Sequence, residues 1–390
     1  MWHVIRIAYF SQDKTPLLLG PVKQLVTRLR EQFSLPVFVT SHWKFGPHLD
    51  LTLKCDQGMF DDAVWPAASD VLERWLAEHP SDVVLNPAEY ERLSYQLAMS
   101  ELEPPPYLPL LENNSVTRAD YQRSKAINVD AFHDTREMFL VGSMPVIFQL
   151  LALRQQSSDQ FFTTLILMMA AVAARFGKKG IARGYVSFRS HAEFFFENFD
   201  KTGQMRQRFE LLDQKFAQEL DANLEAAADG LADRLAVSPA VKAIMTDWEQ
   251  VVAKTYAANQ EVVTTHYDQI IQAEEARSTT EQNFGELAEQ ISEALPDDVQ
   301  KPGRDFNTGK VVKKAMEHQA GRNLFRSVHF ISYRTTVNYF YVLLPVLDIS
   351  PVQKFSLCHL LANAVERVYQ VNWQRVIPNT DGEVSGGEHA

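Results

Sequence analysis

Cysteine is scarce in this chain of 390 residues, which contains only Cys55 and Cys358. Neither belongs to a Cys-x-x-Cys pair, so the sequence predicts neither a zinc site nor a dithiol redox centre. Two isolated thiols without a secretory signal are typical of the reducing cytoplasm, and we expect that location. The longest apolar runs, 139–153 and 161–174, are shorter than the roughly 20 residues that a membrane-spanning helix needs. We therefore expect no membrane segment and interpret both runs as buried helices.

The common catalytic signatures are missing as well. The sequence has no Gly-x-Ser-x-Gly elbow, no phosphate loop, no Gly-x-Gly-x-x-Gly and no His-Glu-x-x-His. These absences disfavour a hydrolase, a nucleotide-using enzyme, a dehydrogenase and a zinc peptidase. Any catalysis is expected to use ordinary side chains, with no metal and no cofactor.

Positive charge is in deficit, since 38 Lys and Arg stand against 49 Asp and Glu for a formal net charge of -11. An acidic chain has no general attraction for phosphate backbones, so direct nucleic-acid binding is not expected without a local basic patch. The sequence offers one modest basic group: Lys178, Lys179, Arg183 and Arg189.

The composition is otherwise ordinary for a globular protein, with 46% hydrophobic and 22% charged residues. Its clearest pattern is the strict alternation of apolar and polar residues over 48–54, the period of a half-buried strand. The leucines of this strand are expected to point into a core. The opposite row is His48, Asp50, Thr52 and Lys54. This row brings together four kinds of chemical group, but it equally fits a solvated sheet face.

The first eighty residues predict an α+β unit. The expected elements are a strand over 2–10, a helix over 17–33, strands over 36–43 and 47–55, and a helix over 61–78. The order β-α-β-β-α is typical of a ferredoxin-like arrangement.

The rest of the chain is expected to be largely helical. Residues 1–100 are expected to form the α+β sheet unit. An irregular Pro-rich connection follows over 101–136. A large, mainly helical portion over 137–375 carries the candidate site, and 376–390 is expected to be a disordered tail.

A second group of polar residues follows the apolar run 161–174. Arg183, Arg189 and His191 lie near the start of an aromatic-rich helix, where such side chains can bind a carboxylate or phosphate. The alternative is that Ser190 caps that helix and Arg189 is solvated.

A third group lies on a late helix that Ser350 is expected to cap. His359 and Asn363 are four residues apart and therefore share a face of this helix. An imidazole on a largely apolar face is more often a satisfied core histidine than a catalyst, and both interpretations stay open. A further polar and aromatic patch, which would either line a cleft or simply pack, consists of Tyr333, Arg334, Asn338 and Tyr339.

Three of these segments together resemble the thiopeptide-type bacteriocin biosynthesis domain family. This family includes the C-terminal elimination domain of class I lantibiotic dehydratases and the thiopeptide pyridine synthases. Residues 46–53 resemble its Gly-x-His-[Ile/Leu]-Arg-[Leu/Val]-Arg strand, and 356–363 resemble its late Ser-x-x-His-Met-x-x-Asn-Arg helix. Residues 187–191 resemble a Ser-x-Arg-Ser-His stretch of the stand-alone members.

The resemblance implies maturation of a ribosomally synthesised peptide by a lyase or cyclase step. Elimination-type members remove the Cα proton of a glutamylated Ser or Thr and expel glutamate, whereas pyridine synthases join two dehydroalanines and expel the leader peptide. The implied partners are the leader region of a precursor peptide, for which the sheet unit over 1–100 is a candidate docking surface, and a separate glutamyl- or aminoacyl-transferring enzyme. A homodimer is left open.

The resemblance also implies roles for particular residues. His359 would transfer protons, Asn363 would orient it, and His48 would be a second polar group at the site. The remaining candidates for binding an anion or the substrate are Arg183, Arg189, His191, Lys54, Tyr333 and Asn338.

The sequence departs from the elimination pattern at three positions. Asp50 and Thr52 replace the two strand arginines, and Ala364 stands where the late helix usually has Arg. Because arginines bind the glutamyl carboxylates in the family, these replacements disfavour glutamate elimination. They favour a diverged lyase or cyclase, or alternatively a non-catalytic partner that binds the precursor peptide or a larger maturation enzyme.

Overall fold

The computed structural model describes the chain except for residues 102, 104, 124–126, 128, 274–309 and 377–390. The predicted tail, 376–390, therefore lies almost wholly outside the described residues. The chain divides into two compact units. Unit 1 is built mainly from Met1–His133 with Pro345–Asp348, and unit 2 from Asp134–Tyr267, Phe306–Leu344 and Ile349–Ala390.

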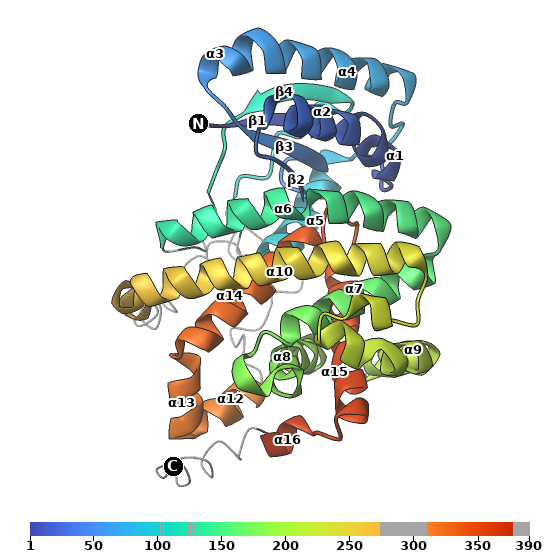
Figure 1. The fold of residues 1–390 in the computed structure, drawn as a ribbon. Coiled ribbons are helices and arrows are strands. Elements are labelled where there is room, and N and C mark those ends of the chain that lie inside the picture. The colour runs from blue at the N-terminus through green and yellow to red at the C-terminus, as the bar shows by residue number, and fades with distance from the viewer. Residues whose placement is uncertain (102, 104, 124–126, 128, 274–309, 377–390) are drawn as a thin grey trace. The chain divides into compact units, whose positions relative to one another are not determined.

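Unit 1 contains a four-stranded antiparallel sheet with the strand order β2-β3-β1-β4 (Figure 1). Its strands are β1 (Trp2–Ala8), β2 (Val37–His42), β3 (His48–Lys54) and β4 (Ser115–Ala119). Its helices are α1 (Thr15–Leu17), α2 (Lys23–Phe33), α3 (Gln57–Met59), α4 (Trp65–Glu78) and α5 (Pro87–Glu101), with π-helical turns at Leu18–Val22 and Phe60–Val64. The predicted succession of strand, helix, two strands and helix is present, and the chain has an α+β fold in which helices predominate.

The leucine face of β3 is buried as predicted. Leu49 and Leu51 pair with Ile7 and Ile5 of the neighbouring β1, and all four side chains are fully buried. On the same face of β1, the His3 ring stacks on Phe60 of the helical layer at 4.2 Å. The alternation in the sequence therefore identified the core face of this sheet.

Most of the opposite row of β3 is buried rather than solvated, which corrects one of the two interpretations offered for it; only Lys54 at its end is exposed. His48 and Thr52 are each only 2% exposed. Asp50 accepts two hydrogen bonds of 2.8 Å from Arg6, its partner across the sheet on β1. Side chains of the neighbouring strands contribute to this burial, and the His42 ring of β2 lies 5.8 Å from the ring of His48.

Strand β4 lies within the stretch 101–136 that was expected to be irregular. It pairs with β1 from Val4 to Ala8 at an edge of the sheet. The strand is short, half-exposed and mostly polar. It is held by backbone hydrogen bonds to β1, and because it lacks an alternating hydrophobic pattern it could not be predicted from the sequence.

Unit 2 consists of helices in its described residues (Figure 1). They are α6 (Asp130–Gln156, which begins in unit 1), α7 (Ser158–Ala173), α8 (Ile181–Phe199), α9 (Gln204–Ala228), α10 (Pro239–Thr265), α12 (Lys310–Glu317), α13 (Gln319–Phe325), α14 (Val328–Leu343), α15 (Pro351–Val368) and α16 (Trp373–Val376). Short 3₁₀ turns occur at Gly177–Lys179 and Ala232–Arg234.

Helix α7 is the central element of unit 2, as its nearly uniform apolar sequence predicts. It is capped by the Ser157 side chain and is buried from Thr163 to Ala173. Helices α8, α9 and α15 pack against α7 and against one another. Gly184 permits the close approach of α8, because a Cβ at this position would lie 1.9 Å from the carbonyl oxygen of Ala173.

Helix α6 is longer than the apolar run 139–153 suggested. With 27 residues it is long and apolar enough to cross a membrane by length and composition alone, yet 61% of its most apolar window is buried inside the protein. A helix that is buried to this extent inside the protein is typical of a helix of the protein core.

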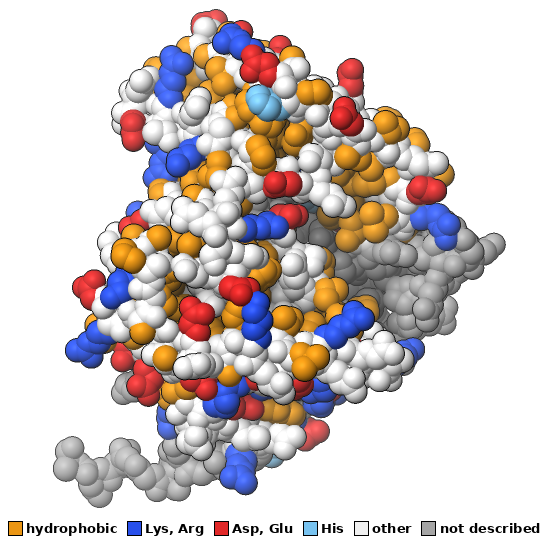
Figure 2. Space-filling view, turned by 90° about the vertical axis from the view of Figure 1, so that its right-hand side faces the viewer, with side chains coloured by type: hydrophobic (Ala, Val, Ile, Leu, Met, Phe, Trp, Pro, Cys, Tyr) orange, Lys and Arg blue, Asp and Glu red, His pale blue; other side chains and the backbone are white. Residues whose placement is uncertain are grey.

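Charges of both signs are interspersed on the face of the molecule in Figure 2, and neither sign forms a continuous field there.

Candidate functional site in the α8–α9–α15 helices

Three of the predicted site residues meet in unit 2. Arg189 on α8 donates a hydrogen bond of 2.7 Å from Nη2 to Asn363 Oδ1 on α15. The Arg189 Nη1 atom also lies 3.5 Å from Nδ1 of His359, one turn before Asn363 on the same helix. The i,i+4 spacing of His359 and Asn363 therefore presents both side chains to α8.

Two carboxylates from α9 complete this cluster, and sequence reasoning missed both. Glu210 Oε1 lies 3.1 Å from His359 Nε2. Asn363 Nδ2 donates to Asp213 Oδ2 at 3.1 Å and lies 3.5 Å from Glu210 Oε2. Because the polar side of α9 is strongly acidic, the sequence favoured a solvated surface there. The only signal was that Glu210 and Asp213 are three residues apart and so share a face.

The two terminal nitrogens of Arg189 contact groups of the protein itself, whereas its buried Nε has no hydrogen-bond partner among the described residues. Besides Asn363, its guanidinium pairs with Glu366 at 3.1 Å and lies 3.9 Å from Glu193. Its side chain is only 5% exposed. Arg189 therefore neutralises buried carboxylates in this structure, which is a different task from holding the carboxylate of a ligand.

Further ion pairs surround the cluster. Glu193 accepts from Arg206 at 2.8 Å and from Lys310 at 2.7 Å. Arg367 bridges Asp221 and Asp213 at 2.9 and 2.6 Å and so ties α15 to α9. Every cation of the cluster has at least one carboxylate partner.

His359 is enclosed and neutral. Its side chain is 1% exposed, and the Phe196 and Phe209 rings lie 5.4 and 6.1 Å from the imidazole. Burial above all, followed by the positive charges of Arg189 and Arg206, lowers the pKa of His359 to about 3. The imidazole is thus uncharged at neutral pH, and with a pKa this low it is a weak base.

His191 belongs to a second chain of polar groups on another side of α8. Its Nδ1 lies 2.7 Å from the Tyr341 hydroxyl, which lies 3.4 Å from Cys358 Sγ. Burial lowers the pKa of His191 to about 4 and raises that of the Cys358 thiol to about 11. The thiol is therefore protonated at neutral pH, a poor state for a nucleophile.

The structure does not bring the other candidates to this cluster. Arg183 is half-buried on α8, six residues before Arg189, so the two arginines project from different sides of the helix. Tyr333 on α14 is buried and donates to the carbonyl of Gly184 at 2.6 Å. Asn338, five residues later, is exposed. Tyr333 therefore packs, and the predicted patch does not form a single surface.

His48 and Lys54 belong to the sheet of unit 1. Nδ1 of His48 lies 2.8 Å from the Gly46 carbonyl oxygen. Burial lowers the pKa of His48 to about 4, against the opposing effect of Asp50. Lys54 is exposed and lies over the Trp2 ring, 5.6 Å from its centroid. His48 thus has the properties of a satisfied, neutral core histidine.

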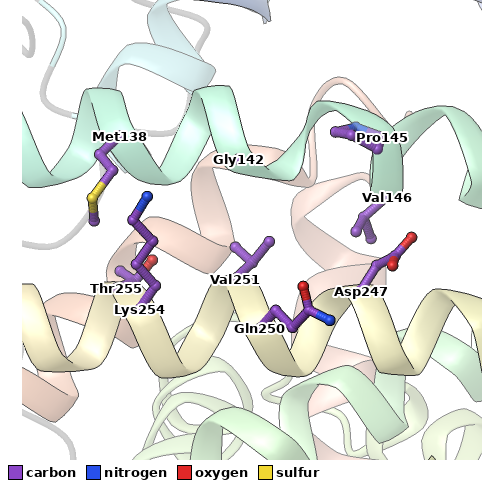
Figure 3. A pocket seen from close by; sticks show the side chains of 9 residues that line it. All are labelled: Met138, Gly142, Pro145, Val146, Asp247, Gln250, Val251, Lys254 and Thr255. Atoms are coloured by element: carbon purple, nitrogen blue, oxygen red, sulfur yellow. The ribbon is translucent and has the colours of Figure 1, made fainter.

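A separate cavity of about 310 Å³ lies between α6 and α10. Figure 3 shows Lys254 reaching from α10 toward α6, with Met138 opposite and Asp247 at the other end of the cavity. None of its lining residues belongs to the His359 cluster. Among the described residues, no group of three or more His, Cys, Asp or Glu side chains could hold a metal ion.

Comparison with known proteins identifies relatives of the whole chain. Residues 2–365 match the family model described as lantibiotic biosynthesis dehydratase C-term. No curated protein sequence matches the chain.

Solved structures give the same picture of the fold. Over 95% of this chain and 99% of the other, the structure resembles the pyridine synthase TbtD from thiomuracin biosynthesis, with a TM-score of 0.67 and 20% identity. TsrL is similar over 97% of this chain and 98% of its own, with a TM-score of 0.63 and 14% identity. The tRNA-dependent lantibiotic dehydratase MibB from Microbispora sp. 107891 aligns over 28% of its length, with a TM-score of 0.48 and 12% identity.

Proposed function

Because the chain belongs to the lantibiotic biosynthesis dehydratase C-terminal family, we propose that it acts in the maturation of a ribosomally synthesised peptide. The step we assign to it is a cyclisation that joins two dehydroamino acid residues of a leader-bearing precursor. Support for a cyclase comes from its likeness, over nearly the whole of both chains, to a pyridine synthase of thiomuracin biosynthesis.

The contacts of Arg189 with other protein groups are the observation on which we favour cyclisation over elimination. Elimination of glutamate needs a cation that binds the departing carboxylate, because charge must be stabilised where it develops. Arg189 is instead held by Asn363, Glu366 and Glu193. On β3, Asp50 occupies a position where the elimination pattern has arginine, and it is already paired with Arg6. Cyclisation needs mainly positioning and proton transfer, and it does not depend on a free cation that binds a departing carboxylate.

Unit 1 is the part that we assign to the leader peptide. Its strand order β2-β3-β1-β4, with every neighbouring pair antiparallel, supports a ferredoxin-like unit. The sheet has two edges, β2 and β4, and an extended peptide can add to a sheet edge through main-chain hydrogen bonds. The implied partners are the precursor peptide and a separate glutamyl- or aminoacyl-transferring enzyme.

A binding role without catalysis is the second candidate, and one specific observation favours it. Both nitrogens of His359 contact protein groups, and the ring is 1% exposed. An enclosed histidine with both nitrogens in contact with protein groups also fits a purely structural role, as expected in a family member that no longer catalyses a reaction. Such a protein would bind the precursor peptide or a larger maturation enzyme.

Mass spectrometry of the precursor peptide tests these assignments. The peptide encoded beside this gene would be co-expressed with its other maturation enzymes, with and without this protein. We expect a protein-dependent loss of the leader and a ring-sized core product. A loss of glutamate or water would instead establish an eliminase, and an unchanged peptide that co-purifies with the protein would establish the binding role.

A further inference from the structure

The imidazole of His359 has no nitrogen available to a substrate in this structure. Its Nδ1 faces Arg189 and its Nε2 faces Glu210, at 3.5 and 3.1 Å. Aromatic rings from α8 and α9 close over it. A substrate could reach either nitrogen only if this packing opened.

The hydrogen-bonding groups around the imidazole define which nitrogen carries the proton. A guanidinium can only donate, so Nδ1 of His359 accepts from Arg189. The neutral ring therefore carries its hydrogen on Nε2 and donates it to the Glu210 carboxylate. The Asn363 amide oxygen accepts from Arg189, and the amide nitrogen lies 3.1 Å from both Asp213 Oδ2 and His359 Nε2. Because Nε2 already carries the hydrogen of the neutral ring, the amide nitrogen donates to the carboxylates of α9 instead.

Glu210 is the member of this chain of groups that reaches solvent. Its side chain is 46% exposed, whereas that of His359 is 1% exposed and that of Arg189 is 5% exposed. One carboxylate oxygen is held by His359, and the other lies 3.5 Å from the Asn363 amide. The carboxylate is thus oriented from its buried side and open on its outer side.

From this arrangement we infer that Glu210 is the catalytic residue that contacts the peptide, and that His359 is a positioning residue acting through it. The inference rests on the proposed cyclisation. Ring formation requires one peptide amide to become its imidic-acid tautomer. The Glu210 carboxylate takes the proton from the amide nitrogen, the C–N bond gains double-bond character, and Glu210 returns a proton to the carbonyl oxygen. No net proton is consumed, so no further reactant is needed.

Two substitutions separate the roles of the pair. Glu210→Gln keeps the size of the side chain but cannot accept a proton, and we expect product formation to fall about 100-fold or more, in the range of lost acid–base catalysis. His359→Gln keeps an N–H donor for Glu210 but removes the imidazole, and we expect a fall of no more than about 10-fold. Glu225→Gln, at an exposed carboxylate of the same helix, is the matched control and should be as active as the unaltered protein.

Rates would be measured with the dehydrated, leader-bearing precursor peptide, and circular dichroism would confirm that each variant folds. Glu210→Ala, assayed with and without added formate, provides a second test, because the open side of this position should admit a small carboxylate and recover activity. Full activity of Glu210→Gln, or a His359→Gln variant as inactive as Glu210→Gln, would overturn the inference while leaving the cyclase assignment intact. If the unaltered protein leaves the peptide unchanged, the proposed function itself fails, and the role of Glu210 fails with it.

Discussion

At the scale of single residues, the role of each candidate depends on the groups that its side chain contacts, and not on its residue type alone. Arg189 matches the kind of residue that binds a carboxylate, but buried carboxylates of the protein already surround it. Removing one member of a buried ion pair leaves an uncompensated charge, which costs far more than the loss of an exposed pair. Arg189 should therefore be a large determinant of stability.

Replacement of Arg189 by Met tests this. The change keeps most of the side-chain volume but leaves Glu366 and the Asn363 amide without their cation, and we expect a loss of about 3–5 kcal/mol in the free energy of unfolding. The control is Arg74→Met, whose partner is Asp70 and where both side chains are about two-thirds exposed, at 64% and 65%. Its loss should be below about 1 kcal/mol. Urea denaturation measures both, and equal losses would show that Arg189 is not a buried structural cation.

At the level of residues, the spacing along the sequence predicted which side chains share a helix face, but it could not predict their contacts with other helices. The four-residue spacing of His359 and Asn363 correctly placed both side chains on one face of α15, and the stretch 187–191 contains Arg189, which contacts both. The partners on α9 could not be found, because Glu210 and Asp213 are separated from His359 by about 150 residues and only tertiary packing brings them together. The Arg6–Asp50 pair was missed for the same reason, since the strand register decides it.

At the scale of elements, the contact between α7 and α8 positions the site, and two glycines allow a direct test of it. Gly184 lies where α8 meets the end of α7, and an added Cβ would overlap the Ala173 carbonyl. Gly142 lies inside α6, and a Cβ there would meet only Val251 at an ordinary contact distance of 3.8 Å. The same substitution should therefore have opposite effects at the two positions.

Gly184→Ala should lower the free energy of unfolding by about 1–3 kcal/mol, because α8 must shift away from α7. Gly142→Ala should be neutral or stabilising by up to about 1 kcal/mol, because alanine favours the helical backbone. Thermal unfolding of the two variants measures the difference. A Gly184→Ala variant as stable as Gly142→Ala would mean that α8 does not approach α7 closely.

Elements with strong periodicity or caps were predicted well, and weakly patterned ones were not. Helix α15 begins at Ser350, whose side chain forms a capping box with Gln353, and both the cap and the Pro351 signal are visible in the sequence. Strand β4 has no such signal. Its place is set by the edge of β1 that faces away from β3.

At the scale of the whole molecule, neutral histidines with lowered pKa values link stability to pH in both units. His48 in unit 1, and His191 and His359 in unit 2, have pKa values lowered to about 4, 4 and 3 from an ordinary value of 6.5, with burial as the main cause. The unfolded chain therefore binds more protons than the folded one below about pH 6.5. The stabilising contribution is complete above that pH and is lost as the pH falls toward the folded-state values.

The resulting prediction is a decline in stability between about pH 6.5 and pH 4.5, above the range in which most carboxylates titrate. Each of the three histidines can contribute up to about 1.4 kcal/mol per pH unit in this window. Urea denaturation followed across the window should show the decline, and His48→Gln should make it shallower because one buried titrating group is removed. A decline that is unaltered in the variant would mean that His48 takes up a proton in the folded sheet, where Asp50 lies 3.9 Å from its Nε2 and would stabilise the charge. Stability independent of pH would mean that all three imidazoles are accessible to protons in the folded protein, which would also remove the enclosure on which the division of roles between His359 and Glu210 depends.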